Sequence, residues 1–176
     1  MNRRTPLDNC REMLVSQLLI LGEEKRTFLD AYFDVRNPER IQLDKQLMAY
    51  TERVEQLLAG PDESLSSVVL IGSQIELEYV DFHTSDKLTI VMPEEADPDE
   101  GQISFLSPVG RQLLLGNKGE ERAISTPSGS MKIRIADIQW AFEQSSELVQ
   151  ELEQADDEAK QNPLQGLTQG GANHAL

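Results

Sequence analysis

The feature that most constrains the fold is a change of hydrophobic period near residue 66. From there to about residue 138, apolar and charged residues alternate in short runs, as in residues 75–79 (IELEY) and 131–135 (MKIRI). A side-chain period of two is typical of strands with one buried face and one wet face. This segment therefore predicts a small sheet with antiparallel pairing.

A short helix interrupts the strand-like segment. Ser107 and Pro108 stand before an apolar run that ends at Gly116. A serine hydroxyl accepts from early backbone N–H groups, and proline suits the first helical position because the N–H it lacks would have no partner there. An acidic loop, residues 94–100 (EEADPDE), lies before this helix. Strands combined with one packed helix predict an α+β domain.

Residues 66–138 resemble the carboxy-terminal domain of the GreA/GreB transcription elongation factors. The resemblance is carried by Glu-Ala-Asp-Pro at 95–98, Ser-Pro-Val-Gly-Arg at 107–111, and Thr-Pro-Ser-Gly at 126–129, where the family usually has Thr-Pro-Gly-Gly. The resemblance implies an FKBP-like antiparallel sheet with a short helix. Composition alone allows other small α+β sheets.

Two helices with heptad-like spacing come before the sheet. Thr5-Pro6 and Asn37-Pro38 each place a capping side chain before a proline, and Gly60-Pro61 ends the second helix. Each helix needs the other to cover its apolar stripe, which predicts an antiparallel α-helical coiled-coil hairpin roughly 35–40 Å long, loosened at Gly22. The apolar positions are Leu7, Leu14, Leu18, Leu21, Phe28 and Tyr32, then Leu43, Leu47, Tyr50, Val54 and Leu57.

The last part of the chain is acidic. Residues 140–160 have an apolar stripe led by Trp140 among acidic side chains, which predicts an amphipathic helix that docks within the chain more readily than on a partner. Residues 161–176, rich in Gly, Gln and Asn, predict a disordered tail. The expected parts are thus the hairpin (1–60), the resembling domain (61–139), the acidic helix and the tail.

Composition limits the kind of binding partner and the cellular compartment that we expect for this chain. The formal net charge of -15 argues against direct nucleic-acid binding, so contact with nucleic acid is expected only through a protein partner with a basic surface. A single cysteine, Cys10, allows no internal disulfide, and no apolar run has the length of a membrane span. The sequence predicts a cytoplasmic chain, away from membranes, that is a monomer when free.

No cofactor, metal site or catalytic centre of the chain's own is expected. Cys10 has no histidine near it in sequence, and His83 and His174 lack metal-ligand spacing. The acidic loop lacks the alternating ligands and central glycine of an EF-hand, which favours a solvated loop. A peptidyl-prolyl isomerase is suggested by the FKBP-like fold alone, and fold does not confer activity.

The resemblance also implies a partner and two surfaces. Gre factors bind RNA polymerase and insert the hairpin into its secondary channel, where two carboxylates in an Asp-x-x-Glu-Asn tip help to hold a catalytic Mg²⁺. Here Asp34 matches the first carboxylate and Asn37 replaces the second, which leaves Glu39 as the substitute. Arg36 and Arg40 add positive charge at the tip. The docking face of the family implies polymerase contacts at Asp97, Ser107, Pro108 and Arg111.

These residues leave three hypotheses for the function. The first is a non-enzymatic Gre-superfamily factor that occupies the secondary channel and modulates elongation without strong stimulation of transcript cleavage. The second is a cleavage-stimulating factor with a degenerate tip. The third, from outside transcription, is the peptidyl-prolyl isomerase suggested by fold alone. A regulator like Rnk, a relative described as a nucleoside diphosphate kinase regulator, is a further alternative, although its hairpin is shorter than the one predicted here.

Overall fold

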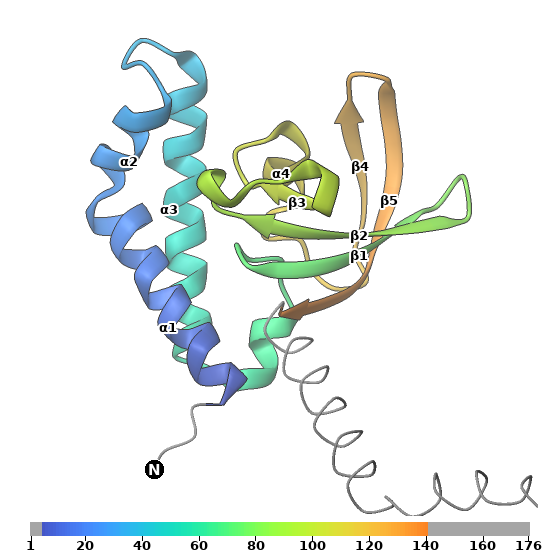
Figure 1. Cartoon of the computed structure of the whole chain (residues 1–176), viewed down its shortest axis with the longest axis horizontal. Helices are drawn as coiled ribbons and strands as arrows, with labels where there is room; N and C mark the ends of the chain where they lie inside the picture. Colours follow the sequence, from blue (N-terminus) through green and yellow to red (C-terminus); the bar gives the residue numbers. More distant parts are fainter. Residues whose placement is uncertain (1–4, 141–176) are drawn as a thin grey trace, which may run out of the picture. The chain divides into compact units, whose positions relative to one another are not determined.

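The computed structural model describes residues 5–140. Its first part, which we call the arm, consists of helices α1 (Pro6–Leu18) and α2 (Lys25–Tyr32), joined by a π-helical turn at Leu19–Glu23, and the returning helix α3 (Pro38–Leu58). Figure 1 shows α3 running back beside α2 and α1. At 1.5 Å per residue, the 21 residues of α3 span about 32 Å, less than the sequence predicts.

The helix starts are those that the sequence predicts. The Thr5 hydroxyl accepts from the Asp8 backbone N–H (3.2 Å), and the Asp8 carboxylate accepts from the Thr5 N–H (2.8 Å), a reciprocal capping box. Asn37 accepts from the Glu39 N–H at the start of α3 (2.9 Å). The expected loosening at Gly22 is confirmed, because Gly22 lies within the π-helical turn between α1 and α2.

The second part is a five-stranded sheet in the order β3-β2-β1-β5-β4. The strands are β1 (Ser73–Tyr79), β2 (Thr84–Val91), β3 (Gln102–Ser104), β4 (Glu121–Thr126) and β5 (Gly129–Trp140). The expectation of a purely antiparallel sheet is wrong at one edge, since β3 pairs parallel to β2. The chain must cross back between these strands, and the acidic loop with its two 3-10 turns (Pro93–Glu95, Pro98–Glu100) makes that crossing.

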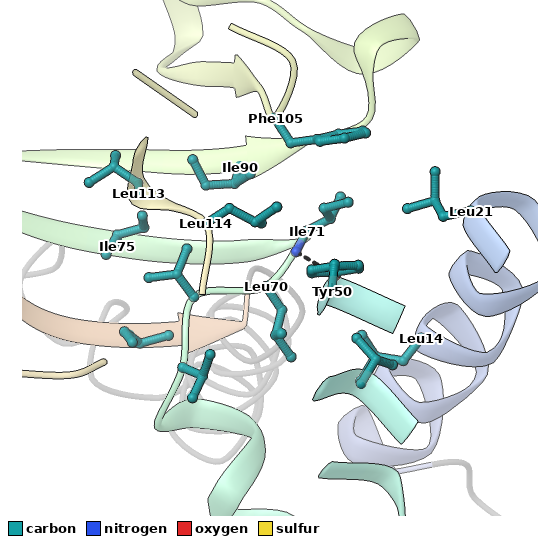
Figure 2. Close-up of a cluster of buried hydrophobic side chains, with 14 of the residues drawn as sticks. Leu14, Leu21, Tyr50, Leu70, Ile71, Ile75, Ile90, Phe105, Leu113 and Leu114 are labelled. Atoms are coloured by element: carbon teal, nitrogen blue, oxygen red, sulfur yellow. Dashed lines mark hydrogen bonds between the residues drawn. The ribbon is translucent and has the colours of Figure 1, made fainter. Parts of the chain in front are cut away.

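The short helix α4 (Pro108–Leu113) begins where the sequence predicts and packs its Leu113 against the sheet. Figure 2 shows Leu113 and Leu114 facing Ile75 and Ile90 of the sheet, with arm residues Leu14, Leu21 and Tyr50 beside them. The arm and the sheet therefore share one hydrophobic core. A domain boundary at residue 60 stays a prediction from sequence.

A buried polar triad joins the base of the arm to the sheet. The Tyr50 hydroxyl donates to the Gln17 side-chain oxygen (2.5 Å) and accepts from the Ile71 N–H (2.9 Å), while the Gln17 amide donates to the Ile71 carbonyl (2.8 Å). Figure 2 marks the Tyr50–Ile71 bond. Both side chains are almost fully buried, and burial raises the pKa of Tyr50. These bonds fix the direction of the arm relative to the domain.

The end of the sheet corrects one sequence-based boundary. Trp140 belongs to strand β5 and pairs with Ser73, so the acidic segment does not begin there. Its ring is 1% exposed and its indole N–H donates to the Leu65 carbonyl (3.2 Å). The remainder of the predicted acidic helix and the predicted tail lie outside the described residues.

Candidate functional site

The loop at the end of the arm holds its first candidate carboxylate in a local turn. Asp34 accepts the Arg36 backbone N–H (3.0 Å), and its carbonyl accepts the Asn37 N–H (2.9 Å). Asn37, where the resemblance implies a second carboxylate in the family, caps α3 with its side-chain oxygen. The local chemistry of this loop is therefore that of a turn followed by a helix start.

Glu39 is directed to the sheet domain by an arginine. Its carboxylate lies 3.7 Å from the Arg111 guanidinium, which also sits 5.4 Å above the Phe33 ring. Arg40 strengthens the same end of the arm, because it donates to the Phe33 carbonyl (2.8 Å) and pairs with Asp30 (2.5 Å). Glu39 and Asp34 therefore interact with different groups, Glu39 with Arg111 and Asp34 with the Arg36 N–H.

Arg111, a predicted docking residue, packs mainly against the arm. Its side chain is only 20% exposed, and its Nε atom is buried without a hydrogen-bond partner. The Gln46 amide of α3 donates to the Arg111 carbonyl (2.9 Å). The contacts of Arg111 reach Phe33, the residue before Asp34, so the sheet domain holds the arm almost to its end.

Two further contacts join the arm to the domain, and local sequence patterns give no sign of them. Phe28 stacks on Phe105 with ring centroids 5.9 Å apart, and the Tyr32 hydroxyl donates to Glu94 of the acidic loop (3.3 Å). Partial burial and the Glu94 carboxylate raise the pKa of Tyr32. Phe28, Tyr32, Phe33 and Gln46 therefore belong to the site, although only long-range packing places them there.

The acidic loop presents Asp97 to solvent on a fixed backbone. The Asp97 N–H donates to the Gln102 carbonyl and the Gln102 N–H donates to the Asp97 carbonyl, both at 2.9 Å. This isolated bridge ties the loop to the start of β3. The Asp97 side chain is exposed, and it lies on a backbone that does not need to be ordered when a partner binds.

Two positions of the Ser-Pro-Val-Gly-Arg motif, Ser107 and Gly110, are required by the local fold. The Ser107 hydroxyl donates to the Ser104 carbonyl (2.7 Å) and accepts from the Gly110 N–H (3.1 Å), so it is used within the fold. A Cβ at Gly110 would lie 2.2 Å from the Ser104 carbonyl oxygen, which explains the glycine. Pro108 is exposed. Of the four predicted docking residues, Asp97 and Pro108 offer the freest side chains.

Other candidates from the sequence remain isolated. Within residues 5–140, no three His, Cys, Asp or Glu side chains gather as a potential metal site. Cys10 is buried in the shared core. His83 lies in the β1–β2 turn with a positive φ of 53°. Among the described helices, none is both long and apolar enough to cross a membrane.

Comparison with known proteins agrees with this architecture. Residues 63–139 match the family described as "Transcription elongation factor, GreA/GreB, C-term". GreA of Nitratidesulfovibrio vulgaris is 31% identical over 134 residues, which cover 76% of this chain and 82% of that protein. GreA of Desulfovibrio desulfuricans is 40% identical over 72 residues, which cover 41% of this chain and 44% of that protein.

Two solved structures are also similar in part. The GreA/GreB factor of Nitrosomonas europaea is 26% identical, with 67% of this chain and 91% of that chain covered and a TM-score of 0.47. GreA factor homolog 1 (Gfh1) of Thermus thermophilus is 28% identical, with 76% and 89% covered and a TM-score of 0.39. The matched domain and the preceding helices define a Gre-type α+β protein. The chain belongs to the GreA/GreB family of transcription elongation factors.

Proposed function

We propose that this protein is a non-enzymatic transcription factor that binds bacterial RNA polymerase and modulates elongation without strong stimulation of transcript cleavage. In this proposal, the sheet domain docks on the polymerase and the arm is directed at the secondary channel. The family membership supports the partner. The relatives named above carry the name transcription elongation factor, and the partner is transferred from that family.

The arrangement of Asp34 and Glu39 is the observation that carries the non-cleaving part of the proposal. Assistance to a catalytic Mg²⁺ needs carboxylate oxygens that are close together and free to approach the ion. One oxygen of the exposed Asp34 carboxylate accepts the Arg36 N–H, and the Glu39 carboxylate lies 3.7 Å from Arg111, so the two carboxylates have different neighbours. Asn37, between them, contributes no negative charge. We therefore expect this tip to occupy the secondary channel without assisting transcript cleavage there.

The docking surface in this proposal is centred on Asp97 and Pro108. Both side chains are exposed, and the backbone of each is fixed by hydrogen bonds to β3 or by the start of α4. A rigid surface loses little conformational entropy when a partner binds. Ser107 and Arg111 support this surface from within, Ser107 as the helix cap and Arg111 as a contact to the arm.

A double substitution tests the docking surface. Asp97→Ala combined with Pro108→Ala is expected to weaken binding to core RNA polymerase by about tenfold or more, because it removes the charge and the apolar ring that the surface presents. The measurement is a binding titration of the full chain by fluorescence anisotropy, with circular dichroism to verify the fold.

The matched control is Asp81→Ala combined with Pro127→Ala, which removes an exposed carboxylate and an exposed proline from turns elsewhere on the sheet domain. This variant should bind as the wild type does. Equal affinities for all three proteins would remove Asp97 and Pro108 from the interface.

A second candidate, a short-armed regulator like Rnk, is favoured by one observation. The arm is held to the domain up to Phe33, so little of it projects freely. A photo-crosslinking amino acid at position 35, where Val35 is 78% exposed, separates the two candidates. Crosslinks to polymerase segments that line the secondary channel support the inserting factor. Crosslinks to other surfaces, or to no polymerase subunit, support the short-armed regulator.

A further inference from the structure

Both sides of the arm depart from regular α-helix near its middle. On the first side, α1 and α2 are separated by the π-helical turn that contains Gly22. On the second side, the Thr51 hydroxyl of α3 donates to the Leu47 carbonyl (3.0 Å) and to the Met48 carbonyl (3.1 Å). Helices bend at π-helical turns, and hydroxyls that bond back to their own helix weaken it locally. Each side of the arm therefore has a point at which it can bend.

These two points face each other across the arm. A Cβ added at Gly22 would lie 3.8 Å from the Thr51 methyl group. An open hollow of about 770 Å³ lies at the same level, lined by residues of both sides of the arm, among them Leu19, Gly22, Thr51 and Glu55. We call the π-helical turn (Leu19–Glu23) together with Thr51 the mid-arm segment. The arm is thus loosely packed at the level where both of its sides can bend.

The base half of the arm, between the mid-arm segment and the sheet domain, is held by buried contacts. The Gln17–Tyr50–Ile71 triad joins it to the sheet domain, and Tyr50 and Leu14 are both 0% exposed within the shared core. Movement of this half would leave buried polar groups without partners, which is costly. The base half is therefore a fixed platform.

The distal half, which comprises α2, the loop at residues 33–37 and the start of α3, is held by contacts that water reaches. The Tyr32–Glu94 bond (3.3 Å) joins two exposed side chains, and the exposed Glu39 carboxylate lies 3.7 Å from Arg111. Arg111 also sits over the Phe33 ring, while its buried Nε atom has no hydrogen-bond partner within residues 5–140. Exposed ion pairs contribute little, and opening would return the Nε–H to water. We call these five residues the latch.

We propose that the arm has a hinge at the mid-arm segment, so that its distal half alternates between the closed arrangement of this structure and an open one in which the latch is broken. The base half stays on the sheet domain in both arrangements. Phe28, 8% exposed, stacks on the fully buried Phe105, so burial makes the closed arrangement the major one. Opening redirects the loop that carries Asp34. The inference does not rest on the proposed function.

Distances between two spin labels in the full chain test the hinge. In a chain with Cys10→Ala, labels are attached at Val35→Cys, in the loop at the end of the arm, and at Ala123→Cys, on β4, both exposed positions. Double electron–electron resonance should give a major distance and a minor, longer one. Labels at Val15→Cys, an exposed position on the base half, and at Ala123→Cys should give one distance.

A latch variant should shift the ratio of the two distances. Phe33→Leu combined with Glu39→Gln is expected to raise the longer-distance population about fivefold, because the ring under Arg111 and the ion pair are both lost. Phe82→Leu combined with Glu63→Gln is the matched control, since it makes the same two changes at exposed side chains outside the latch. This control should leave the ratio unchanged.

A hinge variant should have the opposite effect. Gly22→Ala combined with Thr51→Ala is expected to lower the longer-distance population about threefold, because alanine favours regular helix and carries no hydroxyl to bond back to α3. Circular dichroism verifies the fold of each variant. A single Val35–Ala123 distance in the wild type and the latch variant overturns the proposal, as does a latch variant that shifts the ratio no more than its control. Two distances from the Val15–Ala123 pair would mean that the whole arm turns on the sheet domain, which also overturns it.

Discussion

Replacing Gly110 with alanine is expected to lower the free energy of unfolding by about 3 kcal/mol or more. The new Cβ would lie 2.2 Å from the Ser104 carbonyl oxygen and 3.0 Å from the Phe105 Cα, and both of these are backbone atoms that cannot rotate away. Relief would require α4 to move off β3. The measurement is urea denaturation followed by circular dichroism, with the same variant tested for polymerase binding.

Gly22→Ala is the matched control for Gly110→Ala. It makes the same chemical change, but the added Cβ would lie 3.8 Å from the Thr51 methyl group, an ordinary van der Waals distance. Its stability should equal or exceed that of the wild type, because alanine is the better helix former. If Gly110→Ala and Gly22→Ala unfold at the same urea concentration, the close contact of α4 with β3 is not as described.

Replacing Tyr50 with phenylalanine is expected to lower the free energy of unfolding by about 2–4 kcal/mol. The change keeps the ring and removes the hydroxyl, which leaves the Ile71 N–H and the Gln17 side-chain oxygen without this partner in a buried region. An unpaired buried polar group costs much more than the average hydrogen bond contributes. Thermal unfolding should show the loss as a melting temperature lower by roughly 5–10 °C.

Tyr32→Phe provides the comparison for Tyr50→Phe. The Tyr32 hydroxyl bonds to the exposed Glu94 carboxylate at 3.3 Å, and water can replace that bond. The expected loss is below about 0.5 kcal/mol. Equal losses in the two variants would mean that the triad of Gln17, Tyr50 and Ile71 does not join the arm to the sheet domain.

Sequence reasoning succeeds here where the chemistry is local. The caps at Thr5, Asn37 and Ser107 depend on residues two or three positions away, and all three are found. The buried stripe of α3 follows from its helical spacing alone. Strand β1 likewise follows from its alternation.

The features that local sequence patterns do not predict depend on contacts between distant parts of the chain. Strand β3 has only three residues, too few for a periodic pattern, and only pairing with β2 defines it. Arg111 lies in a motif that suggests a partner, yet Phe33 and Glu39 of the arm contact it. The buried triad has one local indication in the sequence, the polar Gln17 among Leu14, Leu18 and Leu21. Its partner Ile71 is 54 positions away, so the sequence alone does not identify the contact.

We propose that this chain binds RNA polymerase and lends no strong cleavage activity. The most direct measurement adds the full chain to a stalled elongation complex, with binding and transcript cleavage recorded in the same samples. We expect saturable binding and cleavage at the background rate, with Asp34→Ala indistinguishable from the wild type. Robust cleavage by the wild type that disappears in Asp34→Ala, or no binding at all, would contradict it.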